Sequence, residues 1–399
     1  MDRLAGTILQ APSVDACNQT CWSARWDFGE SKTLIARPAV AWLTVALFLW
    51  FGKHWLGEFG SALWSASLFL WLFGVVLWCA FVVVGEADHL AELLAEPLGT
   101  LILTLSIVII EVVLIGAVAI GSESAPTLGR DTMFAVLMIV LNGAIGLCLL
   151  SGGLRHHEQA YNLQGAVAYL AVIIPLSAIA LILPNFTRAF PAGSLTLTQA
   201  AFFSLFTVLL YGIFLAIQTR RHRDFFIEPN PNAEQVAATS KPDKRISRAD
   251  VIGWHTFLLV ITILPIVLLA KQLATLIDRG IAVLRAPAAL GGVLIAVIVF
   301  APEAISALRA ALDNQLQRSI NLCLGAAAST ISLTVPAILG IGIVTGKPMI
   351  LGLEPTGMTL LVLTLLLSTL TFSGPRTTVL EGSVHLVLFL VYIVLIFSP

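Results

Sequence analysis

The chain has 399 residues, of which 58% are hydrophobic and only 11% are charged, and its net charge is −1. Soluble domains usually carry about 25% charged residues, so this composition excludes an ordinary water-soluble protein. The near-zero net charge gives no reason to expect a nucleic-acid partner. Apolar runs of transmembrane length recur along the chain without the alternation of barrel strands. The sequence therefore predicts an all-α polytopic membrane protein.

Eleven transmembrane helices are predicted from the lengths of the apolar runs. The predicted spans are residues 39–57, 61–84, 97–120, 131–150, 163–184, 196–218, 253–275, 286–309, 318–345, 357–373 and 377–397. The polar residues 1–38 contain no charged region followed by an apolar run, so we expect a cytoplasmic extension rather than a signal peptide.

The loop at residues 219–252 differs from all the others because it carries seven Lys and Arg residues. The positive-inside rule places such a loop in the cytoplasm, and its Pro, Asn and Ser content is typical of a flexible linker. Six predicted spans precede the loop and five follow it. The N-terminus is therefore expected in the cytoplasm and the C-terminus outside.

The linker divides the chain into a first half, residues 39–218, and a second half, residues 253–399. After one extra N-terminal helix, each half supplies five spans. Because five is odd, equivalent helices of the two halves must cross the membrane in opposite directions. Inverted repeats around a midplane site are an architecture of transporters.

The third span, "PLGTLILTLSIVIIEVVLIGAVAI", contains a single charged residue, Glu111. At 100° per residue, Thr100, Thr104 and Glu111 share one helix face. An acid inside a membrane span is a functional candidate by default. The alternative is a protonated glutamate that only bonds a neighbouring helix.

The eighth span contains Pro302 and Glu303 side by side. Pro302 cannot donate a hydrogen bond to the carbonyl of Ile298. A freed carbonyl and a carboxylate are oxygen ligands of the kind that hard cations prefer. The alternative is a proline kink beside a hydrogen-bonded acid.

A weak internal similarity aligns residues 128–146 with residues 316–334 and sets Asn142 opposite Thr330. The helix before each stretch carries one acid, Glu111 or Glu303, and the two acids are expected to meet near the bilayer centre. Asn142, Ser329, Thr330 and Thr104 are candidate neutral ligands, although Ser and Thr also commonly bond their own helix. A proton and a cation would then compete for the same two acids.

Three further polar clusters accompany the spans. Glu86 and Asp88 are predicted at the cytoplasmic entrance, where they would either gather cations or belong to a solvated connector. Glu381 and His385, four residues apart, would relay protons or gate the site, or simply bond each other. Adjacent histidines do not share a helix face, so "RHHEQ" at 155–159 is interpreted as a surface cluster.

At these residues the chain resembles the calcium/cation antiporter superfamily, and within it the ChaA-type bacterial calcium/proton (sodium, potassium/proton) antiporters. The resemblance is carried by "EPLGTLILTLSIVIIEV", "TMFAVLMIVLNG", "LRHHEQAYNLQG", "APEAISALRAALDNQLQRSINLCLGAAASTISLTVPAIL" and "TVLEGSVHLVLF". It implies eleven helices, two inverted repeats and one glutamate per repeat, Glu111 and Glu303, in a central cation site. It also implies roles for Asn142, for the hydroxyls of Ser329 and Thr330, and for Glu381.

The resemblance implies a secondary antiporter in the cell inner membrane, with inorganic cations, protons and membrane lipid as its expected partners. It would export Ca²⁺, with Na⁺ and K⁺ as further candidate ions, in exchange for H⁺ without a cofactor. This chain has "SIVIIE" and "VFAPEA" where the wider family carries asparagines and a histidine, so a monovalent-only Na⁺(K⁺)/H⁺ antiporter is the alternative. A passive channel, an intramembrane enzyme and a non-transporting receptor are further alternatives, although no HExxH or GxSxG motif supports an enzyme.

Overall fold

The computed structural model describes residues 32–57, 62–94, 98–121, 126–188, 192–227, 248–346 and 349–398. Most of the predicted N-terminal extension and of the predicted basic linker lies outside the described residues. The described part is almost entirely helical, with a single two-stranded sheet. The predicted all-α polytopic fold is confirmed.

The elements of the first half begin with the extra helix and end before the basic linker. They are α2 (Lys32–Gly57), α3 (Ala62–Leu94), α4 (Leu98–Gly121), α5 (Leu128–Met138), η1 (Ile139–Ala144), α6 (Ile145–His156), β1 (Gln159–Ala160), α7 (Leu163–Ser177), η2 (Ala178–Ile182), η3 (Leu183–Phe186), α8 (Leu197–Ala216), η4 (Ile217–Arg221) and η5 (Arg223–Phe226).

The second half repeats this order without the extra helix. Its elements are α10 (Arg248–Leu284), α11 (Ala289–Leu312), α12 (Leu316–Ser329), η6 (Thr330–Thr334), α13 (Val335–Thr345), α14 (Pro355–Thr371), β2 (Arg376–Thr377) and α15 (Val379–Phe397).

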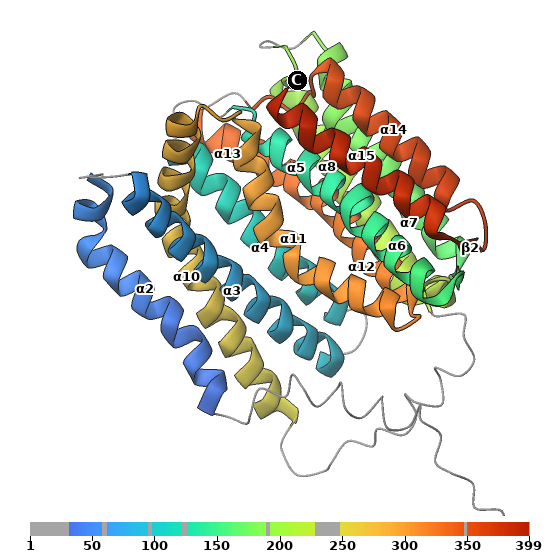
Figure 1. Ribbon diagram of the computed structural model, residues 1–399, viewed down its shortest axis with the longest axis horizontal. Helices are drawn as coiled ribbons and strands as arrows, with labels where there is room; N and C mark the ends of the chain where they lie inside the picture. The colour runs from blue at the N-terminus through green and yellow to red at the C-terminus, as the bar shows by residue number, and fades with distance from the viewer. Residues whose placement is uncertain are drawn as a thin grey trace, which may run out of the picture.

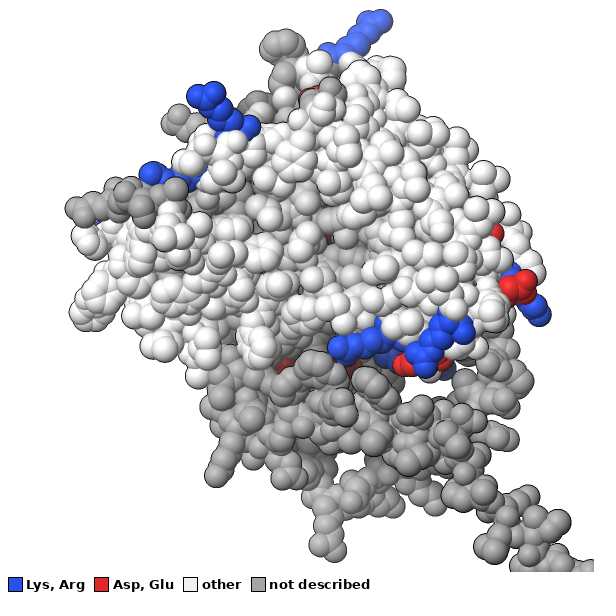
Figure 2. Space-filling model, in the orientation of Figure 1, with Lys and Arg blue, Asp and Glu red and all other residues white. Residues whose placement is uncertain are grey.

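Each of the eleven predicted spans corresponds to one helix or to consecutive helical segments that follow one another without a break. Within the described ranges, nine helices are long and apolar enough to cross a membrane, and Ile102–Ala117 and Pro355–Thr371 are shorter apolar helices. In Figure 2 a broad uncharged band separates Lys and Arg side chains at the upper left border from those along the lower right border. Such a band is the surface that the hydrocarbon core of a bilayer requires.

The largest errors in the predicted boundaries concern α3 and α10, the first helix of each five-helix repeat. α3 continues to Leu94, ten residues beyond the predicted end, and α10 continues to Leu284. The interpretation of residues 85–97 as a solvated connector is therefore wrong for the residues that α3 includes. Apolar run length ends a prediction at the first charged residues, whereas α3 continues past Glu86, which contacts His255 of α10.

The helices are arranged so that the two acid-bearing helices lie in the middle of the molecule (Figure 1). α2, α3 and α10 pack together on one side, and α6, α14 and α15 lie on the other. α4 and α11 lie between these groups and contact each other, and each also contacts helices of the opposite half.

A first inter-half clamp joins the α6–α7 connection to the α14–α15 connection. Strand β1 pairs with β2 in an antiparallel register that sets Gln159 opposite Thr377. The buried Tyr161 hydroxyl donates to the Gly374 carbonyl, and burial, together with the nearby Glu381 carboxylate, raises the pKa of this phenol above its usual range. The phenol therefore remains a donor at physiological pH.

The same α6–α7 connection holds the turn between α11 and α12. His156 Nε2 lies 2.8 Å from the Leu312 carbonyl oxygen, and Gln159 Nε2 donates to the Ala311 carbonyl at 2.8 Å. The surface interpretation of "RHHEQ" is therefore wrong for His156 and Gln159, because both side chains bond the end of the Glu303 helix. A local periodicity argument does not detect a partner more than 150 residues away.

A second inter-half clamp joins the connection that precedes α14 to the connection that precedes α8. The backbone N–H groups of Leu351 and Gly352, before α14, donate to the Gly193 carbonyl before α8, both at 2.9 Å. This segment also holds the first turn of α5, because Arg130 Nη1 donates to the Gly352 carbonyl at 3.0 Å.

The two clamps show that the halves are inverted relative to each other. The first clamp uses the connection between the third and fourth transmembrane segments of the first half, and it lies beyond the C-terminal end of α14. The second uses the same connection of the second half, and it lies before the N-terminal end of α14. Equivalent connections therefore lie at opposite ends of one helix, as a pair of inverted five-helix repeats requires.

The third transmembrane segment of each half is interrupted by a π-helical turn. η1 separates α5 from α6, and η6 separates α12 from α13. In the second half, Pro336 has no N–H to donate to the Ser332 carbonyl, which favours the shift away from α-helical bonding. Asn142 lies within η1 and Thr330 opens η6, so the residues aligned by internal similarity occupy equivalent π turns.

Candidate functional site: two buried carboxylates

Glu111 lies near the middle of α4 and is completely buried. Thr330 Oγ1, from η6 of the other half, donates to Glu111 Oε2 at 3.1 Å. Thr334, one turn further, also lies close to this carboxyl group. Glu111 Oε1 has no hydrogen-bond partner among the described residues. A buried charge costs much free energy unless it is compensated, so this half-bonded carboxyl group requires a proton or a cation.

Glu303 lies within α11 and is only 4% exposed. Neither of its carboxyl oxygens has a hydrogen-bond partner in the described part of the chain. α11 remains helical through Pro302, and it contacts η1 of the first half. Glu303 is therefore the less compensated of the two acids.

The two acids influence each other directly. α4 and α11 are in contact, and the carboxyl group of Glu303 lies within range of electrostatic repulsion from Glu111 and from Asp88. Like charges in a buried site repel each other, so a bound cation favours the ionised form of both acids. Carboxylate and hydroxyl oxygens are the ligands that Ca²⁺ and Na⁺ use in proteins. The donor set therefore fits a hard cation that replaces a proton.

The other predicted neutral ligands have different partners. Ser329 Oγ donates to the Ala326 carbonyl of its own helix at 3.0 Å. Thr104 is half-buried and lies within hydrogen-bonding reach of Tyr211 on α8. The side chain of Thr100 lies outside the described part. Of the hydroxyls singled out as ligands, Thr330 is the one that contacts an acid.

Asn142 belongs to a separate buried network that contains neither acid. Its Nδ2 donates to Thr364 Oγ1 at 2.8 Å, and its Oδ1 lies 3.1 Å from His385 Nδ1. The other ring nitrogen, His385 Nε2, lies 2.9 Å from Thr371 Oγ1. All four side chains are buried, so the network joins η1 to both α14 and α15.

The close approach of α15 to α6 makes this network possible. A Cβ atom on Gly382 would lie 2.4 Å from the Leu150 backbone nitrogen, and one on Gly146 would lie 3.0 Å from the Cβ of His385. Small residues allow helix backbones to approach closely in membranes. Glycines at these two positions therefore bring His385 within reach of Asn142.

Glu381 does not bond His385, so the interpretation in which these two residues simply bond each other is wrong. Its carboxylate accepts hydrogen bonds from the Thr378 backbone N–H at 2.9 Å and the Thr378 hydroxyl at 2.5 Å. This is a capping box at the start of α15. Spacing of four residues permits contact on a helix, but the cap orients Glu381 toward the helix start.

Glu86 forms an ion pair at the end of α3. Its Oε2 lies 2.6 Å from His255 Nδ1 on α10, and the His255 ring also lies 5.4 Å from that of His89. Glu86 is buried, whereas Asp88 is exposed and lies within electrostatic range of Glu303. The two predicted entrance acids therefore differ: Glu86 joins α3 to α10, whereas Asp88 is exposed within electrostatic range of Glu303.

Sequence reasoning missed Thr364, Thr371 and His255. Thr364 and Thr371 are seven residues apart on α14 and share a buried face with Ser368. A search for hydroxyls at helical spacing within an apolar run would have found this stripe. His255 has no such signal, because a lone histidine near a helix start is ordinary.

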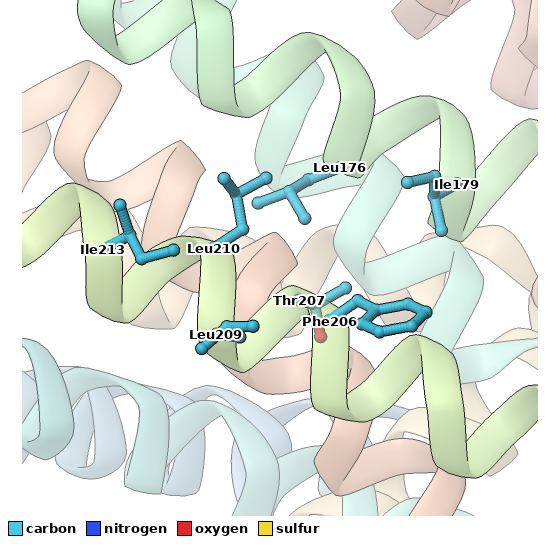
Figure 3. Close-up of a pocket in the computed structure, with 7 residues that line it drawn as sticks. All are labelled: Leu176, Ile179, Phe206, Thr207, Leu209, Leu210 and Ile213. Carbon is cyan, nitrogen blue, oxygen red and sulfur yellow. The ribbon is translucent and has the colours of Figure 1, made fainter.

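The pocket between α7 and α8 is not part of this site. Figure 3 shows its lining, which is apolar apart from Thr207 and encloses about 240 Å³. Within the described ranges no group of three His, Cys, Asp or Glu side chains could hold a resident metal ion. The carboxylate pair is therefore the candidate site for a transported cation.

Comparisons with known proteins identify the family of the chain. The sequence profile of the family described as "Sodium/calcium exchanger protein" matches residues 64–220 and 254–398. The chain is 40% identical over 336 residues to a "Putative ionic transporter y4hA" from Sinorhizobium fredii, covering 84% of this chain and 90% of the relative. It is 38% identical over 367 residues to the "Sodium-potassium/proton antiporter ChaA" of Escherichia coli, covering 92% and 96% respectively.

Among solved structures, the fold is similar to that of the "H+/Ca2+ Exchanger CAX". The TM-score is 0.67 at 15% sequence identity, and the match covers 91% of this chain and 87% of the other. At this identity the likeness concerns the fold alone.

Proposed function

The chain belongs to the sodium/calcium exchanger family, and from that premise we propose that Glu111 and Glu303 carry cations and protons alternately across a membrane. The protein is a multi-pass membrane transporter that exchanges cations for protons, and the family is not one of enzymes. Cations and protons are its cargo rather than cofactors.

The observation that carries the proposal is the pair of buried carboxyl groups with unpaired oxygens. Glu303 has no hydrogen-bond partner on either oxygen, and Glu111 has none on Oε1, among the described residues. Each acid must be neutralised by a proton or by a cation, because an uncompensated charge is too costly there. A proton and a cation cannot neutralise the same carboxylate at the same time, so binding of one requires release of the other. This competition is the chemical basis of obligatory exchange.

Thr330 and Asn142 complete the site in this proposal. Thr330 donates to Glu111 and retains hydroxyl lone pairs for a cation. Asn142 lies in η1, which contacts α11, the helix that carries Glu303. Each acid helix thus faces the π turn of the opposite half, and a relative movement of the halves would open the site to one side at a time.

The transported ion is proposed to be Ca²⁺, with Na⁺ and K⁺ as further substrates. Two carboxylates balance the charge of a divalent ion. A relative named as a sodium-potassium/proton antiporter, at 38% identity, favours the second candidate, a monovalent-only exchanger. The sparse neutral donors around the acids also suit this second candidate.

We place the protein in the bacterial inner membrane, with the N-terminus in the cytoplasm and the C-terminus outside. The support is the density of Lys and Arg at residues 219–252. In this orientation Glu86 and Asp88 lie at the cytoplasmic entrance, and Asp88 draws cations toward Glu303.

The test uses the full chain reconstituted in liposomes that contain a pH-sensitive dye. An acid-inside gradient is imposed, and Ca²⁺, Na⁺ and K⁺ are added separately outside. We expect at least one cation to dissipate the gradient, with an apparent KM that rises as the pH on the cation side falls, because protons and cations compete. Glu303→Gln should abolish this movement.

Glu158→Gln is the matched control, because Glu158 is an exposed glutamate paired with Arg376 at the surface. It should exchange like the wild type. Full-rate exchange by a correctly folded Glu303→Gln protein would contradict the proposal. Cation flux that ignores the pH gradient would indicate a channel, and no flux with any of the three ions would favour a receptor.

A further inference from the structure

The buried network around Asn142 defines the hydrogen-bonding state of His385. Asn142 Oδ1 can only accept a hydrogen bond, so His385 Nδ1 must carry a proton. His385 Nε2 then accepts from the Thr371 hydroxyl in the neutral ring. The ring has one defined orientation, and through it Asn142 is held with Nδ2 toward Thr364.

Asn142 occupies the position at which the opposite half contacts an acid. The equivalent residue, Thr330, donates directly to Glu111. Asn142 lies in the π turn that contacts α11, the helix of Glu303. The contacts that hold its amide therefore also hold the π turn that packs against the helix of the uncompensated acid.

Comparison of the two repeats shows that the fold does not require a histidine at the position of His385. The last helix of each half begins with a threonine capping box, at Thr196 in α8 and at Thr378 in α15. Aligning the two caps sets Phe203 opposite His385. A ring of similar size but without nitrogens therefore suffices at the equivalent position, so packing alone does not explain the imidazole.

We propose that His385 is a positioning residue, which fixes the Asn142 amide and with it the π turn η1 that packs against the Glu303 helix, and thereby tunes cation affinity. This inference rests on the proposed function and deepens it, because it assigns a role to a residue that contacts neither acid. The close crossing of α6 and α15 at Gly146 and Gly382 holds the two side chains in register.

The experiment compares two substitutions that each retain one of the ring contacts. The amide of His385→Asn reaches the place of Nδ1 and can still donate to Asn142. The amide of His385→Gln reaches the place of Nε2 and retains the contact with Thr371 alone. Thr371→Val removes that second contact and leaves the first. Each full-length variant is reconstituted, and exchange is measured against Ca²⁺ and Na⁺ concentration.

We expect His385→Gln to raise the apparent cation KM roughly tenfold, because the variant loses one buried hydrogen bond. The maximal rate should change about twofold at most. His385→Asn should recover most of the affinity, and Thr371→Val should change KM less than about twofold. Adding His385→Gln to Asn142→Ala should raise KM no further, because the histidine acts through the amide.

Several results would overturn the proposal. These are an unchanged KM in His385→Gln, equal damage from Thr371→Val, failure of His385→Asn to recover affinity, or additive effects in the double variant. Each would show that the ring serves only packing or another partner.

A measurement on the unmodified protein guards against variants that do not fold. The seven histidines are labelled with ¹⁵N, and the His385 signals are identified by their loss in His385→Asn or, if it does not fold, by site-specific labelling. The proposal requires a proton on Nδ1. A neutral ring protonated on Nε2 alone would overturn it.

Failure of this inference differs from failure of the proposed function. If Glu303→Gln abolishes exchange while His385→Gln behaves as wild type, the antiporter assignment stands and the positioning role is wrong. If Glu303→Gln still exchanges fully, the site itself is wrong.

Discussion

The surroundings of Glu111 and Glu303 differ although the two acids occupy equivalent helices of the inverted halves. Glu111 receives a hydrogen bond from Thr330 of the opposite π turn, whereas Glu303 has no donor within the described residues. Asn142, the residue equivalent to Thr330, bonds His385 and Thr364 instead. The two repeats therefore place one acid each on equivalent helices, but the two carboxyl groups differ in the hydrogen bonds that they receive.

This difference suggests that the two acids have different tasks in the cycle. A carboxyl group with one built-in donor is stabilised even when no cation is bound. A carboxyl group without donors depends entirely on its proton or its cation. Glu303, which also lies near the exposed Asp88, is therefore the acid that responds most strongly to the ions of the adjacent solution.

The largest effect is expected when either negative charge is removed. Two unit charges 4 Å apart attract by about 4 kcal/mol at the effective dielectric constant of a protein. Glu111→Gln and Glu303→Gln should therefore each slow exchange more than about 100-fold at a fixed low cation concentration. Initial rates of gradient dissipation in liposomes measure this, with Glu158→Gln as the control. If either variant retains a tenth of the wild-type rate, the site needs only one acid.

Stability without cations should separate the two acids. At alkaline pH, Glu303→Gln should raise the free energy of unfolding by about 1–2 kcal/mol, because an ionised group without donors is replaced by a neutral one. Glu111→Gln should gain less, because it disturbs the bond from Thr330. Thermal unfolding in detergent gives the order. Equal shifts for the two variants would show that their compensation is equal.

Removing the donor of Glu111 should make the two acids more alike. Thr330→Val deletes the hydroxyl and keeps the shape, so we expect the apparent cation KM to rise about fivefold, as for one lost hydrogen bond. Thr330→Ser retains the hydroxyl and should stay near the wild-type KM. Concentration series for Ca²⁺ and Na⁺ measure both variants. A rise in Thr330→Ser as large as that in Thr330→Val would assign the effect to packing.

The smallest effect is expected at the Glu86–His255 pair, which lies away from the carboxylate site. The His255 side chain is 20% exposed, so solvent screens the pair and its contribution to exchange should be small. Glu86→Gln should change the exchange rate less than about threefold. This change in rate should depend less on ionic strength than the change caused by Asp88→Asn. Rates at low and high ionic strength provide the comparison. A loss as large as that of Glu303→Gln would place Glu86 in the ion-binding site.

The sequence by itself determined the class of the protein, the eleven spans and the two central acids. Apolar runs of about twenty residues have few folded solutions other than membrane helices, because each backbone polar group must find its partner within the segment. An acid in such a run is expensive enough to be noticed without any structure. Once the extra N-terminal helix is set aside, each repeat has five spans, and this odd number also predicted the inversion that the two clamps display.

Only the tertiary structure decided which polar groups meet. Thr330 lies 219 residues from Glu111 along the chain, and His385 lies 243 residues from Asn142. Hydroxyl and amide groups on a helix choose between their own backbone and a neighbour, and that choice depends on how closely the helices cross. Ser329 therefore bonds its own helix while Thr330 reaches an acid, a distinction that two adjacent hydroxyl residues do not reveal in sequence.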